Sequence, residues 1–227
     1  MEKFELIYQR AAERKGGEAQ LESLLPEVLT PDQLAGLDDS RYLAQFSKSV
    51  FQSGFVWRVV EQKWPDFEEV FFNFDPQTLL LLSDEQWEQK GKDTRIIRNM
   101  SKVMTIKHNA QMIWDMQTEH GSFAHFIAQW PEEDIVGLWL FLKKRGKRLG
   151  GNTGPYALRQ LGKDTFIFSS DVWAYLKAHK IVSASSATSQ RAMKEAQEAF
   201  NTWHQQSGRS LSQISRILAM STGDNYL

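Results

Sequence analysis

The chain has 227 residues, of which 27 are basic and 28 acidic, so its formal net charge is −1. This balance excludes a histone-like polycation but allows a local basic patch, because electrostatic attraction depends on how charge is distributed. The absence of cysteine excludes disulfides, thiolate zinc ligands and cysteine nucleophiles.

With 41% hydrophobic residues and eight tryptophans, the composition predicts a globular protein with a filled core. The longest apolar stretch, residues 135–142, is far shorter than the ~20 residues that span a bilayer. The first residues lack the charged-then-apolar pattern of a signal peptide. We therefore expect a cytoplasmic protein without a membrane partner, and we take it to be monomeric.

Helix start signals recur along the chain. Residues 30–33 (Thr-Pro-Asp-Gln) and 83–86 (Ser-Asp-Glu-Gln) each combine a capping residue with a glutamine three positions later, which is the pattern of a capping box. Asp75-Pro76 resembles a further start, and residues 210–213 (Ser-Leu-Ser-Gln) open the last predicted helix.

Hydrophobic residues recur at helical spacing between these signals. The repeats are Ile96, Ile97, Met100, Val103, Met104, Ala110, Ile113 and Trp114, then Met193, Ala196, Phe200 and Trp203, then Leu211, Ile214, Ile217 and Leu218. No alternating strand pattern with turn dipeptides accompanies them. The sequence predicts an all-α fold over residues 1–227, a single domain of two helical lobes in which the two chain ends meet in one lobe. The serine-rich segment 183–189 is short enough to be an interhelical loop.

A glycine-rich hairpin is predicted at about residues 143–161. An apolar helix ends in Lys143-Lys144-Arg145, a turn with several glycines follows, and a second helix begins near Pro155 and runs to about Leu161. Glycines allow close approach of the backbone to another surface, and a helix N-terminus attracts anions. The residues that would hold nucleic-acid phosphates here are Lys144, Arg145, Lys147, Arg148, Gly150, Gly151 and Gly154. The alternative is a solvated interhelical turn with a charged end.

A carboxylate follows the hairpin. After the apolar residues 165–168, the segment Ser169-Ser170-Asp171 opens a third helix over about residues 172–177. Asp171 fits a position facing a nucleotide sugar, and it equally fits an ordinary helix cap. The two roles are compatible.

This segment resembles the helix-hairpin-helix of the DNA glycosylase superfamily, in which an aspartate past the hairpin faces the damaged nucleotide. Residues 51–57 (FQSGFVW) are similar to the Gln-x-Gly-x-x-Trp helix of the DNA-3-methyladenine glycosylase I family. Residues 67–76 (FEEVFFNFDP) resemble its Phe-Asp-Pro segment, and residues 93–99 (DTRIIRN) with Lys102 and Asn109 resemble its Ile-Ile-Arg-x-x-x-Lys helix. The resemblance covers roughly residues 45–175.

The resemblance implies roles for several residues. Trp57 matches the tryptophan that stacks on the flipped base, for which core packing is the alternative role, and Tyr8 is the nearest candidate for a pocket tyrosine. Ser49 stands where the family has its base-reading glutamate, and with Gln52 it would offer hydrogen bonds to the base edge. Counting from Val172 sets Ser170 opposite the family's aspartate; counting from the superfamily's helix start sets Asp171 there, and we favour Asp171.

The chain also departs from typical members, which tie their termini together with a zinc site. It lacks cysteine, and its histidines (His108, His120, His125, His179 and His204) do not have metal-ligand spacing, so we expect no zinc. Pro155 and Tyr156 stand where a Schiff-base lysine would lie, which favours a monofunctional reaction. No organic cofactor is implied, although the hairpin carbonyls could hold a monovalent cation.

The sequence therefore predicts a DNA glycosylase of base excision repair. Its substrate would be double-stranded DNA containing a damaged base, and it would hydrolyse the N-glycosidic bond of an alkylated purine such as 3-methyladenine after base flipping. Asp171 would be catalytic, by stabilising positive charge on the sugar. The alternative is a catalytically inactive helix-hairpin-helix protein that binds DNA.

Overall fold

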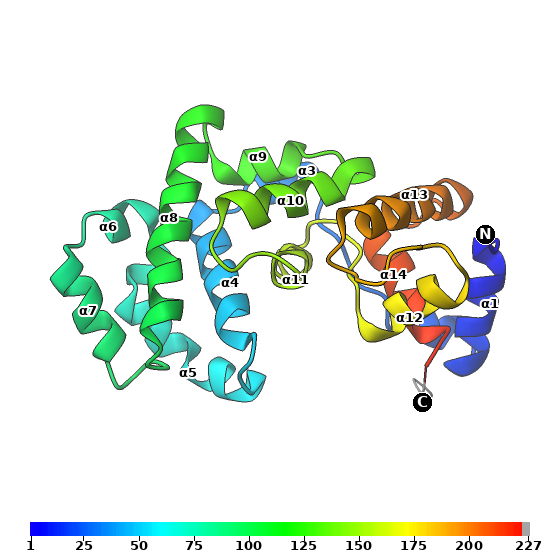
Figure 1. The fold of residues 1–227 in the computed structure, drawn as a ribbon, viewed down its shortest axis with the longest axis horizontal. Helices are drawn as coiled ribbons and strands as arrows, with labels where there is room; N and C mark the ends of the chain where they lie inside the picture. The colour runs from blue at the N-terminus through cyan, green and yellow to red at the C-terminus, as the bar shows by residue number, and fades with distance from the viewer. Residues whose placement is uncertain (224–227) are drawn as a thin grey trace. The chain divides into compact units, whose positions relative to one another are not determined.

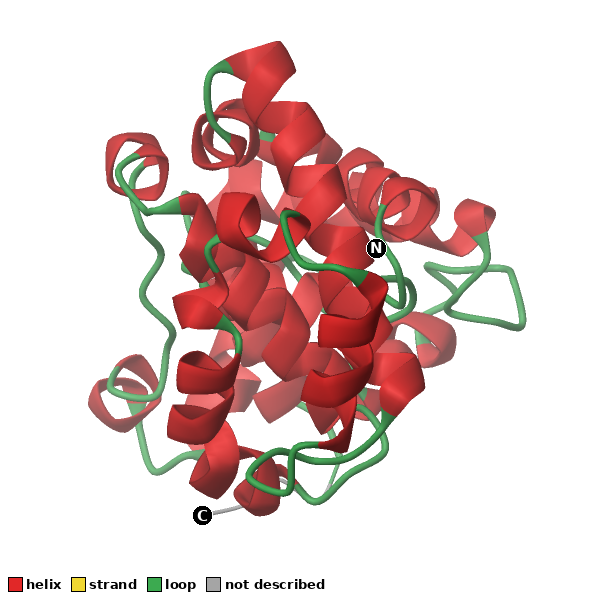
Figure 2. Cartoon of the chain, turned by 90° about the vertical axis from the view of Figure 1, so that its left-hand side faces the viewer, coloured by secondary structure: helices red, strands yellow, loops and turns green. Residues whose placement is uncertain are grey.

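The protein is entirely helical in the part that the structure describes. A computed structural model gives residues 1–223 as 14 α-helices and two short 3-10 helices joined by loops, without a strand among them (Figures 1 and 2). The predicted all-α fold is thus confirmed.

The helices follow one another along the chain with short connections. Their bounds are α1 Phe4–Arg14, α2 Glu18–Glu22, α3 Pro31–Ala35, α4 Asp39–Gln52, α5 Trp57–Val70, η1 Phe72–Phe74, α6 Pro76–Leu80, α7 Asp84–Lys92, α8 Met100–His120, α9 Phe123–Gln129, η2 Glu132–Asp134, α10 Ile135–Arg145, α11 Thr153–Gln160, α12 Ser170–Ala178, α13 Gln190–Ser207 and α14 Leu211–Met220.

The chain forms two compact units. The terminal unit consists of Met1–Leu29, Pro131–Leu138 and the chain from Gly162 onward, and the central unit consists of Thr30–Trp130 and Trp139–Leu161. Both terminal segments therefore belong to one unit. Helix α10 begins in the terminal unit and continues into the central unit.

The central unit is built around α4 and α8, which pack against each other (Figure 1). Helix α8 also contacts α6, α7 and α9, and α4 contacts α5 and α11. The buried Asp39 joins α4 to α9, because its carboxylate accepts the backbone N–H groups of Phe123 (2.8 Å) and Ala124 (2.7 Å). These donors have no partner within their own helix, so the contact satisfies the start of α9.

The terminal unit packs α14 against α1, α12 and α13. A buried carboxylate again fixes a helix start: Asp164 accepts the N–H groups of Leu211 (2.8 Å) and Ser212 (2.7 Å). The buried segment 165–168 is held beside α14, since the hydroxyl groups of Ser212 and Ser215 accept N–H groups from it. This packing fixes the chain that leads from the hairpin to Asp171.

The predicted helix starts are confirmed. Thr30 and Ser83 each form a full capping box, and Asp75 and Ser210 accept the N–H of the residue three positions later. The helical spacing that included Ile96 and Ile97 was misleading. Both residues lie in the irregular segment before α8, which begins at Met100.

The structure also gives the bounds of the two helices after the hairpin turn and of the serine-rich loop. The second hairpin helix begins at Thr153, two residues before the predicted Pro155, and the third runs over Ser170–Ala178. The serine-rich segment 183–189 lies between α12 and α13, as expected for an interhelical loop. No helix within residues 1–223 is long and apolar enough to cross a membrane.

Candidate functional site

A pocket of about 170 Å³ lies in the central unit beside the hairpin. One side comes from the end of α4 and the start of α5, and the other from the start of α11. Its lining residues are Ser49, Gln52, Ser53, Trp57, Asn152, Thr153, Tyr156 and Gln160. The structure thus brings together three residues that the sequence predicted for base binding, and all eight lining side chains are neutral and can form hydrogen bonds.

Two aromatic rings face each other in this pocket. Trp57 and Tyr156 meet edge to face, with ring centroids 6.5 Å apart and planes 89° to each other. Trp57 is 52% exposed, so the core-packing role that its sequence position also allowed is wrong. An exposed indole beside a polar pocket offers a flat surface on which an unstacked base can recover stacking energy.

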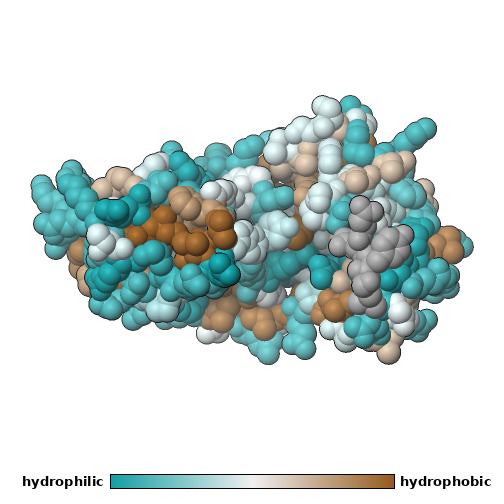
Figure 3. Space-filling model, turned by 90° about the horizontal axis from the view of Figure 1, so that it is seen from below, coloured by the Kyte–Doolittle hydropathy of each residue, from teal (hydrophilic) through white to brown (hydrophobic). Residues whose placement is uncertain are grey.

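The chain before α5 exposes further apolar side chains, namely Phe55, Val56 and Val59. Figure 3 views the molecule from below, the side on which α5 lies in Figure 1, and shows a brown hydrophobic patch there. Such patches on soluble proteins often mark binding surfaces.

Two polar side chains of the pocket are nearly fully buried. Ser49 is 7% exposed and its Oγ accepts from Gln45 Nε2 at 3.2 Å. Gln52 is 4% exposed and its Nε2 donates to Glu61 Oε1 at 3.0 Å. Glu61, one turn beyond Trp57 on α5, also forms an ion pair of 2.7 Å with Lys48. The pocket therefore has a charged network behind a neutral lining.

A buried lysine holds the loop between α4 and α5. Lys102 Nζ, on α8, donates to the backbone carbonyls of Phe51 (3.1 Å) and Ser53 (2.6 Å) and lies 4.4 Å from the ring centre of Phe55. Burial lowers the pKa of Lys102. The lysine satisfies carbonyls at the C-terminal end of α4 and so fixes the loop that leads to Trp57.

The hairpin turn is fixed to α8 by Asn109, which is fully buried. Its Nδ2 donates to the carbonyl of Lys147 (3.2 Å), and its Oδ1 accepts the N–H of the same residue (2.7 Å). Gly154 allows the close approach of α11 to the turn, because a Cβ there would lie 2.5 Å from the carbonyl oxygen of Leu149. Gly151 has a φ of +61°, which favours glycine.

Basic side chains surround the turn. Lys144 and Lys147 are exposed. Arg145 forms an ion pair of 3.6 Å with Asp115, and Arg148 donates to Ser101 Oγ at 2.9 Å. Exposed ion pairs are weak, so they leave these guanidinium groups available to a stronger anion.

Asp171 lies in the first turn of α12, in the terminal unit, and is half-buried. It does not cap the helix: Ser169 is the N-cap, and its hydroxyl accepts the N–H of Val172 at 3.2 Å. The alternative role as a helix cap is therefore wrong. The chain passes close to the carboxylate, because a Cβ at Gly223 would lie 2.7 Å from Asp171 Oδ1.

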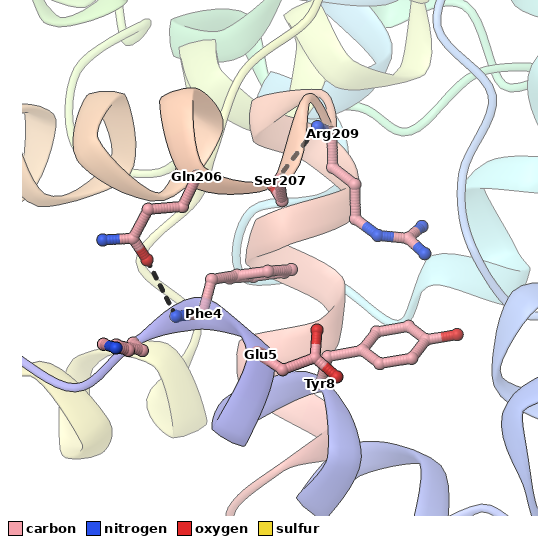
Figure 4. Close-up of a pocket in the computed structure, with 7 residues that line it drawn as sticks. Phe4, Glu5, Tyr8, Gln206, Ser207 and Arg209 are labelled. Atoms are coloured by element: carbon pink, nitrogen blue, oxygen red, sulfur yellow. Dashed lines mark hydrogen bonds between the residues drawn. The ribbon is translucent and has the colours of Figure 1, made fainter.

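Tyr8 lines a different pocket, within the terminal unit, between α1 and the end of α13 (Figure 4). Its hydroxyl donates to Glu22 at 2.7 Å, and Arg209 lies 4.8 Å from its ring centre while pairing with the same glutamate. Burial and Glu22 raise the pKa of Tyr8 to about 12. Tyr8 is thus not among the residues that line the pocket of Trp57.

Sequence reasoning missed part of the site. Tyr156 and Gln160 lie one turn apart on α11, so both face one side of that helix. Their spacing was a signal that they share a surface, but only the fold shows that this surface meets Trp57. Within residues 1–223, no three His, Asp or Glu side chains gather as metal ligands.

Residues 34–138 match the family model of methyladenine glycosylases. DNA-3-methyladenine glycosylase 1 of Escherichia coli (strain K12) is 29% identical over 76 residues, which cover 34% of this chain and 41% of that protein. The chain therefore aligns with about two fifths of the length of this curated relative.

Two solved structures are similar to the chain. A crystal structure of 3-methyladenine DNA glycosylase I is 25% identical, with a TM-score of 0.47, over 60% of this chain and 80% of that chain. The 8-oxoguanine glycosylase/lyase of Methanocaldococcus jannaschii, solved with DNA containing 8-oxoguanine, is 13% identical, with a TM-score of 0.54, over 94% of this chain and 95% of that chain. The second likeness extends over nearly the whole chain and shows a shared helical fold.

Proposed function

We propose that the chain, of which residues 34–138 match the family model of methyladenine glycosylases, is a monofunctional DNA glycosylase of alkylation repair. Its substrate would be double-stranded DNA with an alkylated purine such as 3-methyladenine. One observation carries the proposal: the helix that follows the basic hairpin turn also lines the pocket of Trp57. A protein that grips phosphates at the turn would thus present the pocket next to the strand it holds.

In this proposal the extruded base enters the central-unit pocket. Trp57 stacks on it, with the Tyr156 ring perpendicular to the indole, and Ser49 and Gln52 offer hydrogen bonds to its edge. An aromatic face also attracts a cationic ring, and an N-alkylated purine carries positive charge. The pocket therefore suits such a base although its lining holds no carboxylate.

Asp171 is the proposed catalytic residue. Positive charge develops on the sugar as the C1′–N bond breaks, and a carboxylate nearby stabilises that charge and orients the attacking water. Ser169, and not Asp171, is the N-cap of α12. A cationic purine is a good leaving group, so the proposed reaction needs no Schiff-base lysine.

The turn would bind DNA through Lys144, Arg145, Lys147 and Arg148, with Gly150, Gly151 and Gly154 giving close backbone approach. The proposal includes no zinc and no organic cofactor. A monovalent cation at the hairpin would be held by backbone carbonyls of the turn. We propose a monomeric, cytoplasmic enzyme.

Release of free bases from methylated DNA tests the proposal. The parent chain should release 3-methyladenine, and Asp171→Asn and Trp57→Ala should each lose most of this activity. Asp32→Asn is the matched control for the aspartate, because Asp32 occupies the same second position of helix α3. Trp114→Ala, on the exposed side of α8, is the control for the tryptophan.

If the parent releases no modified base but binds DNA in a salt-sensitive way, the glycosylase proposal fails and the inactive DNA-binding protein is correct. If Asp171→Asn keeps full activity, only the carboxylate assignment fails.

The hairpin is tested separately. Arg145→Ala combined with Arg148→Ala should weaken binding to all DNA sequences and reduce the salt slope by about 2, one for each phosphate contact. Arg191→Ala with Lys194→Ala removes two exposed charges of α13 and should leave the slope unchanged. An unchanged salt slope in the hairpin variant would contradict phosphate binding by these arginines and favour the alternative, a solvated interhelical turn.

A further inference from the structure

The orientation of the Gln52 side chain is fixed by its chemistry. A carboxylate can only accept hydrogen bonds, and the Glu61 carboxylate forms an ion pair with Lys48. The 3.0 Å contact between Gln52 and Glu61 must therefore use the amide nitrogen of Gln52. The opposite orientation would bring two acceptors together, so Glu61 removes the usual ambiguity between amide oxygen and nitrogen.

This contact leaves the amide oxygen of Gln52 for a ligand. Gln52 is 4% exposed and lines the pocket, yet its Oε1 accepts a hydrogen bond from no group in residues 1–223. An amide oxygen can accept hydrogen bonds, so an oxygen that no protein group pairs can accept one from a base in the pocket. Because Glu61 engages the amide nitrogen, the oxygen is the amide atom of this pocket residue that is left to accept a hydrogen bond from a base.

We propose that Glu61 is a positioning residue that makes Gln52 a fixed acceptor, so that the pocket selects a base with an amino group at that edge. The inference rests on the proposed function and adds to it a residue that determines specificity. An exocyclic amino group such as that of adenine donates to Gln52 Oε1, whereas a carbonyl at the same position sets two acceptors against each other. Glu61 itself does not line the pocket and acts through Gln52.

The test compares two free bases that differ at one group. 3-Methyladenine carries an amino group at C6 and 3-methylhypoxanthine carries a carbonyl there. Binding of each base to the full chain is measured by titration calorimetry, and the ratio of the two affinities is the readout. In Glu61→Gln the new amide can donate as well as accept, so Gln52 can turn its own amide over. The preference for 3-methyladenine should fall about fivefold, which corresponds to one hydrogen bond of about 1 kcal/mol.

Glu68→Gln is the matched control. Glu68 also lies on α5 and also forms an ion pair, of 3.0 Å with Arg41, but it does not contact a residue of the pocket. Its substitution should leave the ratio unchanged. Glu61 is half-exposed, so an isosteric change there should not disturb folding.

An unchanged ratio in Glu61→Gln, or a parent chain that prefers 3-methylhypoxanthine, overturns the inference. If the parent binds neither base, the inference fails as well, and the base-release assay then decides whether the proposed function fails with it.

Discussion

The hydrogen bonds of Asn109 give the sharpest stability prediction. Asn109→Ala removes both bonds to the backbone of Lys147, at 3.2 and 2.7 Å. Each neutral hydrogen bond contributes about 1 kcal/mol, so the free energy of unfolding should fall by about 2 kcal/mol. Because Lys147 is exposed, water can take over its backbone groups, and the loss should not exceed this sum by much.

The same change should weaken DNA binding. A turn released from α8 must be ordered when it meets phosphates, and ordering one residue costs about 1 kcal/mol, which is about fivefold in affinity. Urea unfolding and DNA titration at fixed salt measure the two effects. Gln111→Ala is the stability control, since it removes an exposed amide of the same helix that bonds Asp115 at 2.8 Å. A loss below about 0.5 kcal/mol in Asn109→Ala, equal to that of the control, would refute the reasoning.

Three further predictions concern other parts of the fold. Gly154→Ala should lower the free energy of unfolding by about 1–3 kcal/mol, because its Cβ would lie 2.5 Å from the Leu149 carbonyl; a thermal melt unchanged from the parent would contradict this. Asp164→Ala should lower the free energy of unfolding by about 3 kcal/mol, since two backbone donors at the start of α14 lose a charged acceptor. Ser210→Ala removes a neutral cap of the same helix and should lower it by about 1 kcal/mol. Equal losses in urea unfolding would contradict the larger contribution assigned to the charged acceptor. Hydrogen bonds from Arg10 lower the pKa of Glu2 from 4.5 to about 2, so this carboxylate stabilises the fold above pH 4.5 and loses that effect as the pH falls to about 2. The stability difference between the parent and Glu2→Gln should therefore shrink over that interval, and a difference that stays constant in acid would contradict the assignment.

The local features of the fold could be predicted from the sequence. Capping boxes at Thr30 and Ser83 depend on residues three positions apart, so their pattern is visible without the fold. The spacing of Ile96 and Ile97 misled because an apolar repeat does not show where a helix begins. Asn99 accepts the N–H of Lys102 and starts α8 after both residues.

Only those site residues that lie together in one short sequence motif could be predicted from the sequence. Trp57, Ser49 and Gln52 lie within one short segment, and the structure gathers them in one pocket. Asn109 and Lys147 are 38 positions apart, and no local rule joins them. Tyr156 likewise meets Trp57 only because α11 packs against α4.

The division of the chain also affects the order in which its parts can fold during synthesis. Residues 30–130 and 139–161 supply the central unit, whereas the terminal unit joins residues 1–29 and 131–138 to the chain from residue 162 onward. On a ribosome, the central unit can therefore form while helix α1, already made, still waits for α14. Until α14 has been synthesised, the apolar face of α1 that packs against it stays uncovered. A chaperone could bind this apolar face during that interval.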